Sequence, residues 1–417
     1  MENAIRDWRG RAYRVGPVPA DRPRMFWLAW ASMAAIAPLQ YGYAALLTHD
    51  RAMLIPLAAW IVCQAAGALV RGNPRVSLGA GAALTATGLA ALWYGPAWLP
   101  LSLYAVLGGL GAGLVYRACG DVVAAWHPER PAMRVGLVTG AFGYGALPVL
   151  AWAGLFPSTL PWAWPAWAAV AAAVIGAAAL RLRMPPPLWW PDTVDPRAHA
   201  LDSAVLRRTP GAVRDFSLAQ ALRTRELPVL AAILVCAGAV SIADVVIVAA
   251  MAGGAAGAGA LALLVGLNGA GRAVAMRCSE LLGRKAVLAV VLALLTLGQL
   301  LLAGFAATGA PLALWTGALF AGLGGGAFYP LLASLVRDLF GAAGTGGIHA
   351  VVYSAKAAAG LLAVALTWLA LTPPGTAPAP FAGETTLALL IAAALAALPA
   401  VAATRLRAPG LPATIPL

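Results

Sequence analysis

The chain has 417 residues, of which 62% are hydrophobic and only 10% are charged. Soluble proteins carry about 25% charged residues and about 45–50% apolar ones. This composition excludes most soluble enzymes, disulfide-rich scaffolds and disordered proteins. A net charge of +13 is compatible with nucleic-acid binding, but the positions of the basic residues, described below, favour a different explanation.

The sequence contains twelve apolar runs, each long enough to cross a membrane. A spanning helix needs about 20 mostly apolar residues, because each residue rises about 1.5 Å and the hydrocarbon core is about 30 Å thick. The predicted spans cover residues 25–47, 53–70, 76–94, 101–125, 133–156, 162–180, 228–251, 258–278, 286–307, 311–335, 348–371 and 385–401. The predicted fold is therefore an all-α integral membrane protein with twelve transmembrane helices in two six-helix halves.

One long polar segment separates the two groups of six spans. The expected regions are a cytoplasmic tail at 1–24, an amino-terminal half at 25–182, a cytoplasmic central loop at 183–226, a carboxy-terminal half at 227–403 and a cytoplasmic tail at 404–417. Similar turns rich in Gly and Arg follow the second and eighth spans, which favours a duplicated six-helix unit. The first apolar run is too long for a signal peptide, so we expect it to remain as the first helix.

The basic residues follow the positive-inside rule. With the amino terminus in the cytoplasm, the cytoplasmic segments hold 23 of the 28 Lys and Arg residues, and the outer loops hold one, Arg51. This alternation supports the span count and explains the net charge without nucleic acid. Only two basic residues are lysine, and Ala and Gly are abundant, which suits a GC-rich bacterial genome. The expected location is the bacterial inner membrane, with both termini in the cytoplasm.

Two basic residues, Arg272 and Lys356, lie deep within predicted spans. A charge at the centre of a spanning helix costs about 2.5–3.5 kcal/mol. Each of the two lies about eight residues, or about 12 Å, from the cytoplasmic end of its span, and neither has an acid at a helical neighbour. Two unpaired cations at one depth predict an anion site in a central cavity. The alternative is that backbone carbonyls and water satisfy each cation separately.

Three further ionisable residues in the spans allow more than one interpretation. Arg117 and Asp121 are four residues apart and can form an ion pair on one helix face. We favour that pair, near the inner end, over a third positive charge in the cavity. Asp244 is the one isolated acid. It either titrates during transport or neutralises Arg272 or Lys356 when the site is empty.

Five tyrosines fall well inside the spans: Tyr41, Tyr116, Tyr144, Tyr329 and Tyr353. A tyrosine in a span needs a partner for its hydroxyl or contact with water, and phenolic donors give charge-assisted hydrogen bonds to a carboxylate. Each one alone is typical of helix packing, but five beside two cations favour the cavity.

No cluster of residues predicts chemistry of another kind. The four cysteines and four histidines show no metal-ligand or catalytic spacing, so we expect no metal, no cofactor and no catalytic residue. The alternatives from other classes are an integral-membrane enzyme and a non-transporting anion sensor that signals through the central loop.

Several short segments carry a resemblance to a known family. They are Pro38-Leu-Gln-Tyr-Gly-Tyr43, Gly111-Ala-Gly-Leu-Val-Tyr116, Gly140-Ala-Phe-Gly-Tyr-Gly-Ala-Leu-Pro148, Phe216-Ser-Leu-Ala-Gln-Ala-Leu-Arg-Thr224, Asn268-Gly-Ala-Gly-Arg272 and Ser354-Ala-Lys356. With twelve spans and a long inner loop, the chain resembles the major facilitator superfamily and, within it, the oxalate/formate antiporter family. The resemblance covers nearly the whole membrane part, and the Arg and Lys are its most specific feature.

The resemblance implies roles for particular residues. The matching arginine and lysine of the family bind the two carboxylates of the substrate, which implies this role for Arg272 and Lys356. The residues that the resemblance places around the substrate are Gln40, Tyr41, Tyr116, Tyr144, Tyr329 and Tyr353. Tyr353 stands where the family has Trp, and Gly325 replaces a pocket Trp, which predicts a larger site. The family also implies a monomer.

The predicted function is secondary transport of small carboxylates such as oxalate and formate, by alternating access around Arg272 and Lys356. An empty site would carry two uncompensated charges through a closed state at a cost of several kcal/mol, which favours exchange. The alternative is a proton-coupled monocarboxylate symporter. Carriers of that branch keep an acid one turn before the arginine, where this chain has Asn268, and commonly a lysine on span 1, which it lacks. Asp244 is the obvious substitute proton carrier.

Overall fold

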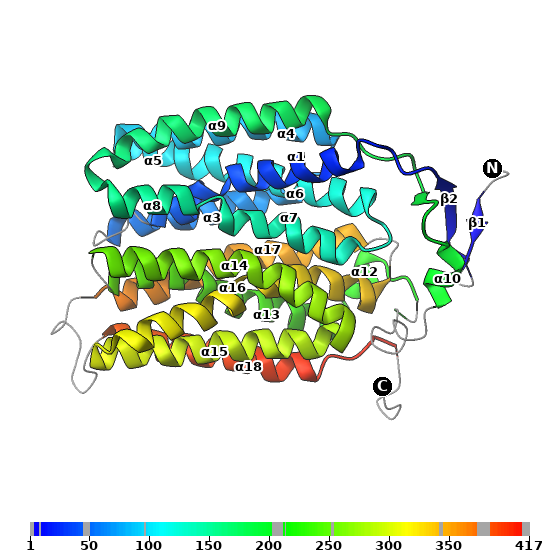
Figure 1. Ribbon diagram of the computed structural model, residues 1–417. Coiled ribbons are helices and arrows are strands. Elements are labelled where there is room, and N and C mark those ends of the chain that lie inside the picture. Colours follow the sequence, from blue (N-terminus) through cyan, green and yellow to red (C-terminus); the bar gives the residue numbers. More distant parts are fainter. Residues whose placement is uncertain are drawn as a thin grey trace.

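The protein is described by a computed structural model that covers residues 4–7, 10–44, 51–95, 97–201, 212, 214–251, 254–341, 345–372 and 384–410. Long helices run side by side in two groups, one from each half of the chain (Figure 1). The amino-terminal group contains α1 (Arg22–Ala35), η1 (Ala37–Leu39), α2 (Tyr41–Ala44), η2 (Arg51–Met53), α3 (Leu54–Leu69), α4 (Pro74–Ala91), η3 (Leu92–Tyr94), α5 (Trp98–Leu103), η4 (Tyr104–Gly108), α6 (Gly109–Trp126), α7 (Pro131–Tyr144), α8 (Leu147–Leu155), η5 (Pro157–Thr159) and α9 (Leu160–Arg181). The carboxy-terminal group contains α12 (Leu218–Ala221), α13 (Glu226–Met251), α14 (Gly254–Leu282), α15 (Arg284–Thr308), α16 (Pro311–Phe340), α17 (Thr345–Ala370) and α18 (Glu384–Thr404).

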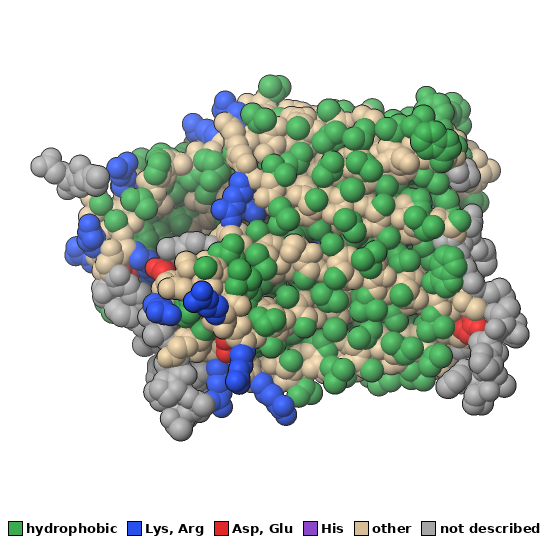
Figure 2. Space-filling view, turned by 180° about the vertical axis from the view of Figure 1, so that it is seen from behind, with side chains coloured by type: hydrophobic (Ala, Val, Ile, Leu, Met, Phe, Trp, Pro, Cys, Tyr) green, Lys and Arg blue, Asp and Glu red, His purple; other side chains and the backbone are tan. Residues whose placement is uncertain are grey.

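The helices confirm the predicted membrane-spanning architecture. Within the described residues, 10 helical segments are long and apolar enough to cross a membrane, and α3 is a shorter apolar helix. The first predicted span is formed by α1, η1 and α2, which completes twelve segments. Large apolar side chains such as Trp27, Ile55 and Leu180 are exposed on the long sides of the bundle, as expected of a surface that faces lipid. Figure 2 shows this broad apolar face, with the Lys and Arg side chains gathered at one end, here called the basic end.

The first predicted span is broken rather than continuous. Helix α1 ends at Ala35, and the short η1 turn contains Pro38. Proline has no amide hydrogen, and its ring clashes with the preceding helical turn, so the helix cannot pass this point unchanged. Gln40 and Tyr41 follow directly, and the break brings both to the centre of the bundle. Residues 45–47 of the predicted span lie outside the described residues.

A three-stranded sheet at the basic end adds to the all-α prediction. Strand β1 (Ile5–Arg6) pairs antiparallel with β2 (Ala12–Gly16), and β2 pairs parallel with β3 (Trp189–Pro191). A short helix, α10 (Pro196–Leu201), follows β3. The sheet therefore joins the amino-terminal segment to the start of the central loop. Strands of two to five residues carry too little periodicity to be recognised in the sequence.

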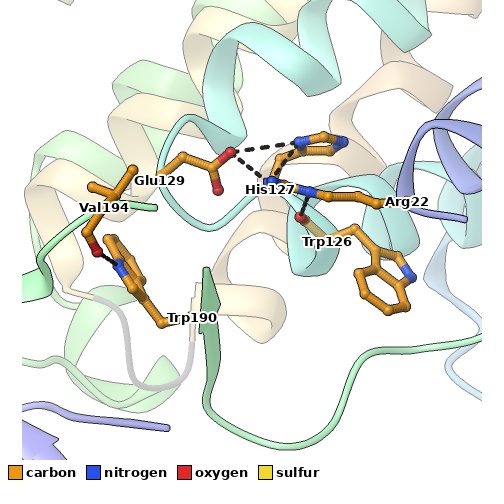
Figure 3. Close-up of polar contacts among 6 residues, drawn as sticks. All are labelled: Arg22, Trp126, His127, Glu129, Trp190 and Val194. Carbon is orange, nitrogen blue, oxygen red and sulfur yellow. Dashed lines mark hydrogen bonds and ion pairs between the residues drawn. The ribbon is translucent and has the colours of Figure 1, made fainter. Parts of the chain in front are cut away.

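A polar cluster at the basic end ties α1 to the turn between α6 and α7 (Figure 3). Arg22 donates from Nε to the Trp126 carbonyl at 2.8 Å, and from Nη2 to Glu129 Oε1 at 2.5 Å and His127 Nδ1 at 2.9 Å. Because a guanidinium only donates, His127 Nδ1 is the acceptor. Burial and the nearby arginines lower the pKa of His127. Burial alone would raise the pKa of Glu129, but contacts with His127, its own backbone amide and Arg22 lower it to about 2.

The two halves touch most closely where α7 crosses α14. A Cβ on Gly140 would lie 2.7 Å from the Gly269 carbonyl oxygen, and one on Gly269 would lie 2.6 Å from the Gly140 carbonyl oxygen. Only glycine at both positions permits this approach of the two backbones. Arg272 lies one helical turn beyond Gly269, so the crossing carries its side chain to the boundary between the halves.

Candidate functional site

A buried polar cavity lies between the two halves. The amino-terminal half lines it with Gln40, Tyr41, Gln64, Tyr116 and Phe142, and the carboxy-terminal half with Ser241, Arg272, Tyr329, Tyr353 and Lys356. These residues come from eight of the twelve spanning segments. None of these ten described residues is acidic, and two are cations. The cavity is therefore positively charged and is shaped by both halves.

Arg272 of α14 is buried and held by groups on two helices. Its Nη1 donates to the Thr139 carbonyl on α7 at 3.0 Å, and its Nη2 donates to Asn268 Oδ1 at 3.0 Å. Its Nε has no hydrogen-bond partner among the described residues. The guanidinium lies 5.5 Å from the centre of the Tyr329 ring and 5.9 Å from that of Phe142. Arg272 thus has a fixed orientation and one donor still unused.

Lys356 of α17 is buried and donates from Nζ to Gln64 Oε1 on α3. This bond crosses from one half to the other, as does the bond from Arg272 to Thr139. The Gln64 amide nitrogen has no partner among the described residues. The Lys356 ammonium also lies 5.6 Å from the Tyr329 ring centre and 5.9 Å from that of Tyr353. Neutral groups therefore surround this cation, and none of them cancels its charge.

The tyrosines form the walls of the cavity. Tyr41 donates to Asn268 Oδ1 at 3.3 Å, a further bond between the halves. Tyr116 and Tyr353, also from opposite halves, stack with ring centres 5.5 Å apart. Tyr329 lies near both cations, as described above. These contacts hold aromatic faces against the cations and bring four of the five predicted tyrosines to one site.

The cavity is narrow in this conformation. About 10 Å³ is open to the centre of a water molecule, which is the room of about one water. The predicted enlargement at Gly325 is not observed, because a Cβ there would lie 3.2 Å from Ser241 Oγ and 3.3 Å from Asn268 Nδ2. These side chains occupy the space that a larger residue would have taken. A molecule larger than water enters only when side chains or the two halves move apart.

Four predicted site residues lie outside the cavity lining: Tyr144, Arg117, Asp121 and Asp244. Tyr144 is half-buried and stacks on Trp30, with ring centres 6.5 Å apart. Arg117 and Asp121 form the favoured ion pair, with 2.5 Å between Arg117 Nε and Asp121 Oδ2. Asp121 is exposed, and Arg117 also donates to the Ala68 carbonyl at 3.4 Å, near the end of α3. Arg117 therefore adds no charge to the central cavity.

Asp244 is buried in α13 but faces a different helix from the cations. Its Oδ2 accepts a hydrogen bond of 2.9 Å from Gln299 Nε2 on α15. It forms no ion pair within 4.0 Å with Arg272, Lys356 or another basic residue of the described chain. In this conformation Asp244 does not neutralise the cavity.

Several residues that line the cavity or contact the cations were not predicted from the sequence. Gln64, Ser241 and Asn268 were visible as polar residues inside apolar runs, and a search for amides and hydroxyls as well as charges would have found them. The Thr139 contact uses a backbone carbonyl, for which the sequence contains no signal. Phe142 was indistinguishable from an ordinary core residue.

The architecture and the cavity together define a class of protein: a polytopic membrane carrier with a central site between two helical halves. The model of the Major Facilitator Superfamily matches residues 25–364. The chain belongs to this superfamily, and it is a membrane secondary transporter of that type. No curated protein matches it in sequence.

Two solved structures share the fold. A mutant of the nucleoside transporter NupG has a TM-score of 0.64 at 10% identity, over 92% of this chain and 99% of that chain. The human organic anion transporter MFSD10 (TETRAN) has a TM-score of 0.58 at 16% identity, over 92% of this chain and 100% of that chain. At these identities the likeness extends to the fold alone.

Proposed function

We propose that the protein exchanges small carboxylate anions, of the oxalate and formate class, across the membrane by alternating access. The observation that carries the proposal is the pair of buried cations, Arg272 and Lys356, in one cavity that both halves form and that no acid among the described residues lines. A buried charge without a counter-ion is costly, and a small anion supplies the missing charge. One structural neighbour is an organic anion transporter, a substrate class that agrees with this proposal.

The unused donor of Arg272 suits a carboxylate. Arg272 Nε is a buried donor without a partner in the described chain. In the proposed bound state, one carboxylate accepts from Arg272 while a carboxylate oxygen replaces Gln64 Oε1 on Lys356. Charge-assisted bonds of this kind are about twice as strong as neutral ones. Gln64 then no longer accepts a hydrogen bond from the lysine.

The same contacts favour exchange over net transport. Both halves must close around the site before the carrier opens to the other side. With substrate bound, the anion compensates both cations in the closed state. With the site empty, the acceptors on the cations are Gln64, Asn268 and the Thr139 carbonyl. These groups are dipoles rather than charges. Closure of the loaded carrier is therefore favoured. The hydrogen bond from Lys356 to Gln64 determines the rate at which the empty carrier closes and reopens to the other side.

The contacts of Asp244 and Asn268 do not favour the rival, a proton-coupled monocarboxylate symporter. That mechanism needs an acid that binds a proton beside the substrate. Asn268 holds Arg272 from the position where such carriers keep an acid, and Asp244 contacts Gln299 rather than the cavity.

We further propose a monomer in a bacterial inner membrane with the basic end in the cytoplasm, in accordance with the positive-inside rule.

The test is exchange in proteoliposomes that contain the purified protein. Labelled oxalate, formate and larger mono- and dicarboxylates are offered to vesicles preloaded with the same unlabelled anion or left empty. Uptake into loaded vesicles that R272Q and K356Q both abolish supports the proposal. R277Q is the matched control, because Arg277 lies on the same helix, is half-exposed and pairs with Glu280 at 3.1 Å. Equal loss in R277Q, or exchange that survives K356Q, contradicts it.

A further inference from the structure

Asp244 and Gln299 form a buried polar pair away from the transport cavity. Asp244 is 1% exposed and Gln299 is 0% exposed. They lie on α13 and α15, two helices of the same half. Neither residue lines the cavity. One hydrogen bond of 2.9 Å joins them, from Gln299 Nε2 to Asp244 Oδ2.

The two remaining oxygens of this pair have no hydrogen-bond partner in the part of the chain that the structure describes. Asp244 Oδ1 and Gln299 Oε1 are both buried without a hydrogen bond to any described residue. Both are acceptors if the acid is ionised, so they cannot satisfy each other. They belong to the same two side chains that already share one bond. A single proton on the acid would convert one of these acceptors into a donor for the other.

The charge of an ionised Asp244 would also lack compensation. No basic residue of the described chain lies within 4.0 Å of its carboxyl group. Its neighbours along helix α13, from Ser241 to Val248, are buried throughout and mostly apolar. An isolated carboxylate in such a medium is so unfavourable that the group binds a proton instead.

We propose that Asp244 is a proton-binding site: the acid holds a proton on Oδ1 and donates it to Gln299 Oε1. The carboxylate takes this proton from a hydronium ion of the solvent as the helices assemble: one O–H bond of hydronium breaks, one O–H bond forms on Oδ1, and a water molecule is left. The result is a reciprocal pair in which the acid donates to the amide oxygen and the amide nitrogen donates to the acid. Each of the four side-chain polar atoms of the pair then has a hydrogen-bond partner.

The location of the pair gives the bound proton a structural role. Both helices belong to the carboxy-terminal half, so rocking of one half against the other does not separate them. The proton stays in place through the cycle, and Asp244 acts neither as a proton carrier nor as the counter-ion of the cavity. This inference does not depend on which substrate the protein transports.

Infrared difference spectroscopy of the purified, substrate-free protein tests the proposal. The wild type minus D244N spectrum is expected to contain the carbonyl band of a protonated carboxylic acid, and that band persists from mildly acidic to mildly alkaline pH. In Q299L the band is expected to shift to higher frequency, because the acid carbonyl loses its amide donor. Carboxylate bands in place of the acid band, or a Q299L spectrum without a shift, would overturn the proposal.

Thermal unfolding supplies a second readout that does not require the spectrum. Asparagine at position 244 can form both bonds of the pair with Gln299, whereas leucine can form neither. D244N is therefore expected to melt at the wild-type temperature and D244L at a lower one. A D244N variant as unstable as D244L would contradict the reciprocal pair.

Discussion

A substitution at Gln64 tests the proposed preference for exchange, because Gln64 is the only described residue that accepts a hydrogen bond from Lys356. Replacing it with leucine preserves the approximate volume of a fully buried side chain and removes an amide nitrogen that lacks a partner. The variant is therefore expected to fold. Its defect is confined to the empty carrier, whose lysine loses its acceptor while the anion still serves the loaded carrier.

The size of the effect follows from the bond that is lost. A hydrogen bond to a charged group contributes about 1.5–3 kcal/mol, and each 1.36 kcal/mol is about a factor of ten in rate. If the closed empty state loses this amount, its return slows by about 10- to 150-fold. Exchange between loaded forms is expected to change little, so the ratio of exchange to net transport rises by the same factor.

The assay compares uptake of a labelled carboxylate into preloaded and empty proteoliposomes, for wild type and Q64L. Q64E is the opposing variant, because its carboxylate compensates Lys356 in the empty state and competes with substrate. It is expected to lower the ratio of exchange to net transport and to raise the half-saturating concentration. If Q64L slows exchange and net uptake equally, Gln64 binds substrate instead, and the reasoning about the empty carrier is refuted.

Three further outcomes follow. Y144F is expected to transport as the wild type does, whereas Y329F, on the cavity wall between the cations, weakens substrate binding; equal effects in the proteoliposome assay would contradict this. G269A forces a Cβ to within 2.6 Å of the Gly140 carbonyl, so melting temperature and exchange both fall. The pKa of Glu129 is lowered from 4.5 to about 2. The ionised carboxylate therefore contributes at most about 3 kcal/mol to the free energy of unfolding. This contribution is full above pH about 4.5 and is lost as the pH falls toward 2. Melting curves of E129Q are expected to lack that acid-dependent loss.

The sequence predicted the features that depend on local composition. Long apolar runs, basic loops and two isolated cations are visible without knowledge of the fold, and the twelve segments follow from them. Pairings between distant positions were not predictable. Lys356 donates a hydrogen bond to Gln64, which lies 292 positions away in the sequence. Asp244 accepts a hydrogen bond from Gln299 and does not pair with a described cation.

Two other differences have causes that the hydropathy pattern does not reveal. The break at Pro38 lies within an unbroken apolar run, so hydropathy alone extends the helix through it. The pairing of β2 with β3 joins segments separated by the whole amino-terminal half, and neither strand is long enough to show alternation. A single backbone constraint determines the first difference, and a distant partner in the sequence determines the second.

The most direct test of the central claim is counterflow of labelled carboxylates in proteoliposomes that contain wild type, R272Q or K356Q. The wild type is expected to exchange at least one small carboxylate, and each substitution is expected to abolish this exchange while the protein remains folded. Exchange that persists in either variant, or a folded wild type that exchanges no carboxylate, would contradict an anion site on Arg272 and Lys356.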